Sequence, residues 1–244
     1  MRLRVCLIAI ALFCAGCSSG SKSGRRVDYS STQRDRVIAS SDSAKLNGTC
    51  PPGMVLIPAG QMLYGPNEER DVKPTAKDVA QRISVKAFCI DKYEYPNEPG
   101  EAPMRSVSWI EAGKLCGDRG KRLCSEYEFE KACRGPAGTV YTYGDGYAEK
   151  VCPKAAENYG LGQFSNCVSG FDVYDMGGGV FEWTSSSVGD NPKADLRILR
   201  GGMNEDGGEQ NSKCTYRTRF AAAQQTRDVG FRCCAAPTKE EIGK

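Results

Sequence analysis

Short runs of apolar residues, several alternating with polar ones, predict strands near both ends of the chain. Pro58-Ala59-Gly60 separates the first two runs and is typical of a tight turn, so we expect these runs to form a hairpin. A later run alternates strictly and leads into Phe88 and Cys89, which is typical of a half-buried strand. The predicted strands cover residues 55–57, 61–64, 83–86, 196–199 and 229–234.

Two short helices are predicted by capping signals. Ser108 precedes Glu111 by three residues, and Ser125 precedes Glu128 in the same way; each pair has the spacing of a capping box. Gly117 and Gly135 are placed to end the helices. The apolar residues that we expect on the inner faces are Trp109, Ala112 and Cys116 in the first helix and Phe129, Ala132 and Cys133 in the second.

The segment after Gly135 has little periodicity. About 60 residues there are rich in glycine and turn formers. A loop-rich segment of that length usually needs a cross-link or a bound ion to hold it. The sequence offers Cys152 and Cys167 for the first role.

The N-terminus has the features of an export signal. Arg2 and Arg4 precede a short apolar run, and Cys14-Ala15-Gly16-Cys17 resembles the lipobox of bacterial lipoproteins. The resemblance implies a signal peptide over 1–16, cleavage before Cys17 and lipidation of that cysteine, including palmitate. The alternative is an ordinary signal peptide and a fully soluble secreted protein.

The next segment, 17–49, is polar and rich in serine, so we expect a flexible, lipid-anchored tether. Ser18, rather than Asp, follows the lipidated cysteine. By analogy with enterobacterial sorting, this favours an outer-membrane anchor, with the protein facing the periplasm or the exterior of the cell envelope.

Composition excludes several classes of chemistry. The chain has 244 residues and no histidine, which excludes Ser-His-Asp and Cys-His catalysis and histidine-ligated zinc or iron. Its formal charge of +3 falls to +1 once 1–16 are removed. A nearly neutral protein gives no reason to expect a nucleic-acid partner.

The cysteine count indicates disulfides. Of 13 cysteines, three belong to the export signal, and an even number in an exported domain favours up to five disulfides. No Cys-x-x-Cys pair occurs, which disfavours zinc and iron–sulfur sites. Cys233 and Cys234 would point to opposite faces of a strand and so have different partners. The ten candidates are Cys50, Cys89, Cys116, Cys124, Cys133, Cys152, Cys167, Cys214, Cys233 and Cys234.

Six motifs in order resemble the formylglycine-generating enzyme, or sulfatase-modifying factor, family. They cover residues 50–236 and leave 237–244 as a tail. The resemblance implies an α+β, disulfide-rich, C-type-lectin-like fold with little regular secondary structure. The motifs are Met54-Val55-Leu56-Ile57-Pro58-Ala59-Gly60, Val107-Ser108-Trp109, Lys121-Arg122-Leu123-Cys124, Tyr174-Asp175-Met176-Gly177-Gly178-Gly179-Val180-Phe181-Glu182-Trp183, Arg200-Gly201-Gly202 and Gly230-Phe231-Arg232-Cys233.

The same resemblance implies a set of disulfide pairs. Cys116 keeps the family's spacing and would pair with Cys233. The partner of Cys133 would lie in the segment between Arg200-Gly201-Gly202 and the closing Gly230-Phe231-Arg232-Cys233 motif, where Cys214 is the only candidate. Cys124 would then take Cys234, and the remaining expected pairs are Cys152–Cys167 and Cys50–Cys89.

The family's glycine-rich loop binds calcium, and the resemblance places the ligands at Asp175, Gly178, Val180 and Glu182. Two carboxylates and two carbonyl groups are the hard oxygen ligands that calcium prefers. Gly179 stands where the family usually has asparagine, so we expect a looser turn. Asn158 resembles a ligand of the family's second site. The alternative is a surface loop with solvated carboxylates.

Catalytic members of the family hold copper(I) with two cysteines five positions apart, after Arg200-Gly201-Gly202. Here Cys214 is the only cysteine in that segment, and Glu209 stands five positions before it. A lone thiolate beside a carboxylate is a poor ligand set for soft copper(I), so copper is not expected.

We therefore expect a non-catalytic, calcium-stabilised module that binds an envelope protein or peptide, or acts as a scaffold, at a membrane. Two alternatives stay open. One is a divergent formylglycine-generating oxidase that uses Cys214. The other is a lectin-like glycan binder that stacks sugars on Trp109 and Trp183.

Overall fold

The computed structural model describes residues 48–66, 68–69, 79–154, 158–188, 195–202 and 208–238. The predicted signal peptide, Cys17 and nearly all of the predicted tether lie outside these residues, as do residues 239–244. In the part of the chain that is described, no helix is long and apolar enough to cross a membrane.

Short strands and three helices form the described fold, with long irregular connections between them. The elements in chain order are β1 Met54–Ile57, β2 Gly60–Tyr64, β3 Glu68–Glu69, β4 Gln81–Val85, β5 Phe88–Asp91, α2 Trp109–Gly117, β6 Arg122–Leu123, α3 Glu126–Arg134, β7 Phe181–Ser187, β8 Leu196–Arg200, α4 Gly208–Asn211, β9 Tyr216–Ala221, β10 Val229–Phe231 and β11 Cys233–Ala235.

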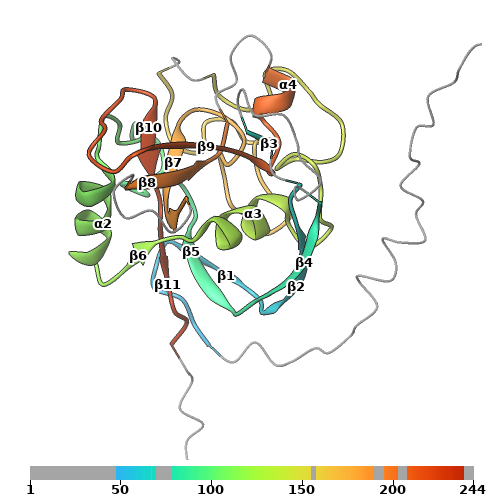
Figure 1. Cartoon of the computed structure of the whole chain (residues 1–244), viewed down its shortest axis with the longest axis horizontal. Coiled ribbons are helices and arrows are strands. Elements are labelled where there is room, and N and C mark those ends of the chain that lie inside the picture. Colours follow the sequence, from blue (N-terminus) through green and yellow to red (C-terminus); the bar gives the residue numbers. More distant parts are fainter. Residues whose placement is uncertain are drawn as a thin grey trace, which may run out of the picture.

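The strands form two sheets and a separate ribbon (Figure 1). One sheet has the order β1-β5-β11-β6 and is antiparallel throughout. The other has the order β10-β7-β8-β9-β3, with parallel pairs at its two edges. β2 and β4 form the ribbon. The first and last segments of the domain meet in the first sheet, and Thr49 pairs with Thr238 where the described chain enters and leaves.

The predicted hairpin between the first two strands is wrong, although both strands exist. β1 pairs with β5, and β2 pairs with β4. The turn residues instead form a corner between the first sheet and the ribbon. The Lys131 ammonium of α3 holds this corner, donating to the Pro58 carbonyl oxygen at 2.5 Å and approaching that of Gly60 at 3.4 Å.

Both predicted helices form where the caps place them. In α3, the Ser125 hydroxyl accepts from the Glu128 amide and the Glu128 carboxylate accepts from the Ser125 amide, which completes the capping box. In α2, Ser108 caps the Glu111 amide, but the Glu111 carboxylate binds Gln225 instead of reaching back. The inner faces are buried as predicted, except that Trp109 is half-buried.

The two longest strands that were not predicted are β7 and β9; the two-residue strands β3 and β6 were not predicted either. β7 follows a glycine-rich run, so its residues, including Glu182 and Trp183, were assigned to a loop. β9 alternates arginines with other residues, which obscured its buried Tyr216. These two strands flank β8 in the five-stranded sheet and carry much of the core beneath α2.

Five disulfides within the described residues tie the loops to the sheets; three are the pairs that the family resemblance implied, and two are the pairs expected of the remaining cysteines. Cys50 is half-buried and the other nine cysteines are buried, and the sequence separations run from 15 to 117 residues. The adjacent Cys233 and Cys234 have different partners, on α2 and beside β6 respectively. The pairs are Cys50–Cys89, Cys116–Cys233, Cys124–Cys234, Cys133–Cys214 and Cys152–Cys167.

A buried arginine joins the ribbon to the five-stranded sheet. Arg200, at the end of β8, donates from Nη2 to the Tyr64 hydroxyl at 2.9 Å and to Glu126 Oε2 at 3.0 Å. The Tyr64 hydroxyl itself donates to Glu126 Oε2 at 2.6 Å. Because one guanidinium, one phenol and one carboxylate satisfy each other away from water, this contact fixes β2, β8 and α3 together.

The close packing of β10 predicts the effect of one small substitution. A Cβ on Gly230 would lie 2.6 Å from the Met104 carbonyl oxygen and 3.1 Å from Val180 Cγ2. We expect Gly230→Ala to lower the free energy of unfolding by roughly 2 kcal/mol or more, because backbone must shift. Urea unfolding followed by circular dichroism measures this.

Gly113→Ala is the matched control, since a Cβ at that position in α2 meets nothing within 4 Å. Alanine in a helix is favoured over glycine by roughly 0.5–1 kcal/mol, so this variant should be slightly more stable. Equal effects of the two substitutions would contradict the packing described for β10.

Candidate functional site

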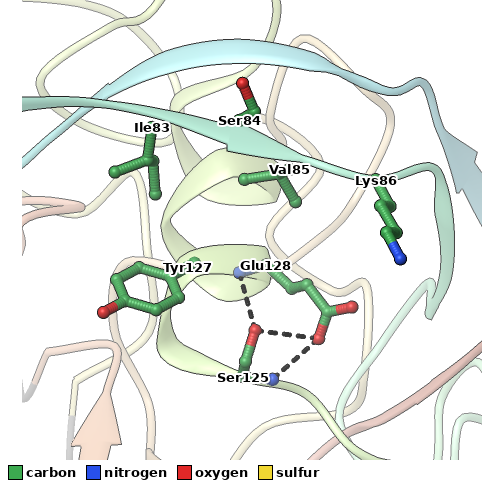
Figure 2. A pocket seen from close by; sticks show the side chains of 7 residues that line it. All are labelled: Ile83, Ser84, Val85, Lys86, Ser125, Tyr127 and Glu128. Atoms are coloured by element: carbon green, nitrogen blue, oxygen red, sulfur yellow. Dashed lines mark hydrogen bonds between the residues drawn. The ribbon is translucent and has the colours of Figure 1, made fainter.

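A shallow depression of about 340 Å³ lies between β4 and the start of α3 (Figure 2). Ile83 and Val85 point toward the helix, while Ser84 points away. Two of its polar groups are already used: Ser125 and Glu128 bind each other, and Glu128 forms a two-pronged ion pair with Arg122. The only acid that lines the depression is therefore engaged, while Lys86 and the exposed Tyr127 also line it.

Cys214, the residue that a divergent oxidase would use, lies elsewhere, in the segment that follows α4. Cys214 is 2% exposed, and its sulfur is bonded to Cys133 at the end of α3. Its amide donates to the Val140 carbonyl oxygen at 2.9 Å. Every cysteine within the described residues is in a disulfide, so this part of the chain provides no thiolate for copper(I) or for nucleophilic chemistry.

A second group of polar residues is buried between β5, β7 and the loop before β7. Arg232, between β10 and β11, is 1% exposed. It donates from Nε and Nη2 to the two oxygens of Glu182, each at 2.7 Å, and from Nη2 to the Tyr174 carbonyl oxygen at 3.0 Å. Both carboxylate oxygens of Glu182 therefore accept hydrogen bonds from the Arg232 guanidinium.

Two more carboxylates share this interior. In each of them, one oxygen accepts a hydrogen bond and the other accepts none. Asp175 Oδ2 accepts from the Gly162 amide at 2.9 Å, while Asp175 Oδ1 accepts no hydrogen bond. Glu94 Oε1 accepts from the Tyr159 hydroxyl at 2.8 Å, while Glu94 Oε2 accepts none and stands 4.0 Å from Arg232 Nη2. Asp175 and Glu94 are 1% and 0% exposed.

The charges in this interior do not balance. Three carboxylates, those of Glu94, Asp175 and Glu182, face one guanidinium. Burial raises the pKa of Asp175 to about 6, although the Gly162 amide and Arg232 oppose the shift. Burial and then the charge of Asp175 raise the pKa of Glu94 well above its usual value, and burial also raises the pKa of Glu182. A cation that met the two unpartnered oxygens would remove this excess negative charge.

The predicted calcium ligands are only partly brought together as expected. Asp175 offers an oxygen, but Glu182 lies in a strand and holds Arg232. Gly178 and Val180 are buried, and their carbonyl groups remain candidates. No cluster of three or more carboxylate, thiolate or imidazole side chains able to hold a metal occurs within the described residues. Asn158 is exposed.

The expectation of a loose turn at Gly179 is wrong. The Gly179 amide donates to the Pro153 carbonyl oxygen at 2.9 Å, and its φ of 73° is a conformation that favours glycine. A Cβ there would lie 2.0 Å from the Tyr159 hydroxyl oxygen. Tyr159 therefore fills the space that the family's asparagine side chain would occupy.

Glu94 was missed in the sequence. It lies just after β5, outside the glycine-rich motif, and only the fold brings it to Asp175. The two tryptophans do not form a stacking platform. Trp183 is 1% exposed in the core, and the Arg197 guanidinium covers the half-buried Trp109 at 3.9 Å from the ring centroid.

Comparison with known proteins identifies the family. Residues 95–237 match the family described as the Sulfatase-modifying factor enzyme 1-like domain, which is more than half of the chain. The chain belongs to this family. The strand pairing places residues before 95 in the same structure, because β1 and β5 form one sheet with β11.

The curated relatives of this sulfatase-modifying factor domain include one named as an inactive enzyme and one named as an enzyme. This chain is 32% identical over 163 residues to the mouse (Mus musculus) protein named inactive C-alpha-formylglycine-generating enzyme 2. The match covers 58% of this chain and 52% of that protein. The chain is 28% identical over 167 residues to mouse formylglycine-generating enzyme, covering 54% and 44%. The chain thus spans about half the length of the curated relatives it matches.

A solved structure confirms the predicted fold. PvdO from Pseudomonas aeruginosa superimposes with a TM-score of 0.55 at 20% identity, covering 78% of this chain and 98% of that one. At this level of identity the likeness shows the formylglycine-generating-enzyme fold alone.

The disulfides of this family member predict a thiol count. We expect the purified protein, truncated to begin at residue 48, to react with no equivalent of maleimide after unfolding without reductant, and with ten after reduction. Intact-mass spectrometry measures both numbers. A single modified cysteine at position 214 before reduction would contradict the Cys133–Cys214 bond.

Proposed function

We propose that this family member is a non-catalytic module of the bacterial cell envelope. The observation that carries the proposal is the Cys133–Cys214 disulfide, which is buried and uses the single cysteine between Arg200-Gly201-Gly202 and the closing Gly230-Phe231-Arg232-Cys233 motif. A fold whose oxidation depends on paired thiolates has no such pair in the described residues. The name of the mouse relative as an inactive enzyme supports the same interpretation.

The proposed role is to bind a protein or peptide, or to act as a scaffold, while a lipid on Cys17 holds the chain at the membrane. Tyrosines beside Cys214 support a binding surface there. The rings of Tyr141 and Tyr143 stack at 5.6 Å, and Tyr147 lies 5.8 Å from Tyr141. Tyr143 and Tyr147 are half-exposed, and tyrosine is enriched in protein interfaces.

The oxidase alternative predicts the opposite result in one assay. We expect no aldehyde when the purified protein is incubated with copper(I), oxygen and a cysteine-containing sulfatase peptide, because every cysteine of the described domain is in a disulfide. Peptide mass spectrometry measures the conversion. A catalytically competent formylglycine-generating enzyme in the same buffer is the control, and a mass loss matching aldehyde formation with our protein would overturn the proposal.

We also propose that calcium stabilises the domain at the interior described above. Asp175 and Glu94 would supply charged oxygens, carbonyl groups of Gly178 and Val180 would add neutral ones, and Glu182 would keep Arg232 in place. These are hard oxygen donors, and two unpartnered carboxylate oxygens are costly to bury unless a cation meets them. Bound calcium would supply positive charge that balances the carboxylates.

Calcium should therefore raise the melting temperature of the protein. A ligand that binds only the folded state at 100 times its Kd adds about 2.7 kcal/mol to the free energy of unfolding. We expect Glu94→Gln to reduce this gain strongly, because it removes one charged ligand. Differential scanning calorimetry with calcium and with a chelator measures it.

Glu98→Gln is the matched control, since Glu98 is an exposed glutamate four residues later. It should retain the full response to calcium. A wild-type melting temperature that is the same with calcium and with chelator would contradict this part of the proposal.

A further inference from the structure

One loop contacts both carboxylates of the proposed cation site. The Cys152–Cys167 disulfide closes a loop with a sequence separation of 15 residues. Tyr159 of this loop donates its hydroxyl to Glu94, and the backbone amide of Gly162 donates to Asp175. The loop thus satisfies one oxygen of each carboxylate and leaves the other oxygen of each without a hydrogen bond.

The part of this loop from 158 to 167, which the structure describes, is held on the domain by backbone hydrogen bonds. The Leu161 amide donates to the Glu101 carbonyl oxygen at 2.8 Å, and the Leu161 carbonyl oxygen accepts from the Gly100 amide at 3.0 Å. Tyr159 is 4% exposed, and the Phe164 ring packs edge-on against it at 6.1 Å. Its hydroxyl is therefore held in one position.

The same tyrosine explains the glycine at position 179. Its hydroxyl oxygen stands 2.0 Å from where a Cβ of Gly179 would be. The glycine-rich turn between Asp175 and Glu182 thus accommodates a side chain from the neighbouring loop. The turn and the loop form one unit around Glu94.

We propose that the disulfide-closed loop is the positioning element of the cation site, with Tyr159 orienting Glu94 and Gly162 orienting Asp175. This inference rests on the proposed calcium site and adds the residues that set its affinity. Neither Tyr159 nor Gly162 touches the cation. Each hydrogen-bonds the far oxygen of an acidic ligand, so that the near oxygen is directed inward before the cation arrives.

The test is calorimetric titration of calcium into the purified protein and its variants. Tyr159→Phe removes the hydroxyl and keeps the ring, and we expect calcium affinity to fall by about tenfold or more, the usual effect of losing a group that orients a metal ligand. Tyr143→Phe is the matched control. The Tyr143 hydroxyl donates to the Ala148 carbonyl oxygen and contacts no carboxylate, so affinity should be unchanged.

A second variant removes the closure of the loop while keeping Tyr159. We expect Cys152→Ser with Cys167→Ser to weaken calcium binding as well, because Glu94 and Asp175 lose their common support. This variant also decides the question if Tyr159→Phe does not fold. Melting temperatures in chelator are measured in parallel, since a merely structural role would lower them without changing calcium affinity.

The outcomes separate the two proposals. Wild-type protein that binds no calcium would overturn both the site and the positioning role. Wild-type protein that binds calcium with the same affinity as Tyr159→Phe and the double serine variant would overturn the positioning role alone. A loss of affinity in both variants, with Tyr143→Phe unchanged, is the result that we expect.

Discussion

Cross-links between buried sulfur atoms are the constraint on which the rest of this structure depends. The described chain has short strands and long irregular segments, so hydrogen-bonded secondary structure alone gives it few fixed points. Cys233 and Cys234 tie the last strand to α2 and to the residue after β6, while Cys133–Cys214 ties α3 to the segment before β9. Each closes a long stretch of chain and so restricts the unfolded state. The same bond that stabilises the segment at Cys214 also removes its thiolate.

Two buried arginines hold the elements of the domain together beside the disulfides. The Arg200–Glu126–Tyr64 contact fixes α3 against two layers, and Arg232 joins β7 to the four-stranded sheet through Glu182. Both arginines are buried and paired, which makes them structural. The excess negative charge at Glu94 and Asp175 has no such balance among the described residues, and it is there that we place a cation.

Local signals in the sequence were sufficient for the helices. Ser125 and Glu128 form their capping box because both partners lie within one turn, whereas three cysteine pairs could be predicted only from the family resemblance. The predicted hairpin at Pro58 does not form because strand pairing is decided by partners that are distant in the sequence. β1 pairs with β5, and β2 pairs with β4. β7 was not predicted because it directly follows a glycine-rich run, which is typical of a loop.

In the candidate site, likewise, only the residues of a recognisable motif could be predicted from the sequence. Asp175 was found because it lies in a recognisable motif, whereas Glu94 and Tyr159 come from separate segments and meet only in the fold. The motif alone predicts a loose turn at Gly179. In the fold, the Tyr159 side chain from another loop fills the space beside this glycine.

The account depends most on the absence of a copper(I) site, and copper affinity tests that directly. Purified protein, kept free of reductant, can compete for copper(I) against a chromogenic chelator under anaerobic conditions. We predict that all of the metal stays with the chelator, because Cys214 is bonded to Cys133. Stoichiometric transfer of copper(I) to the protein, abolished by Cys214→Ser, would contradict the account.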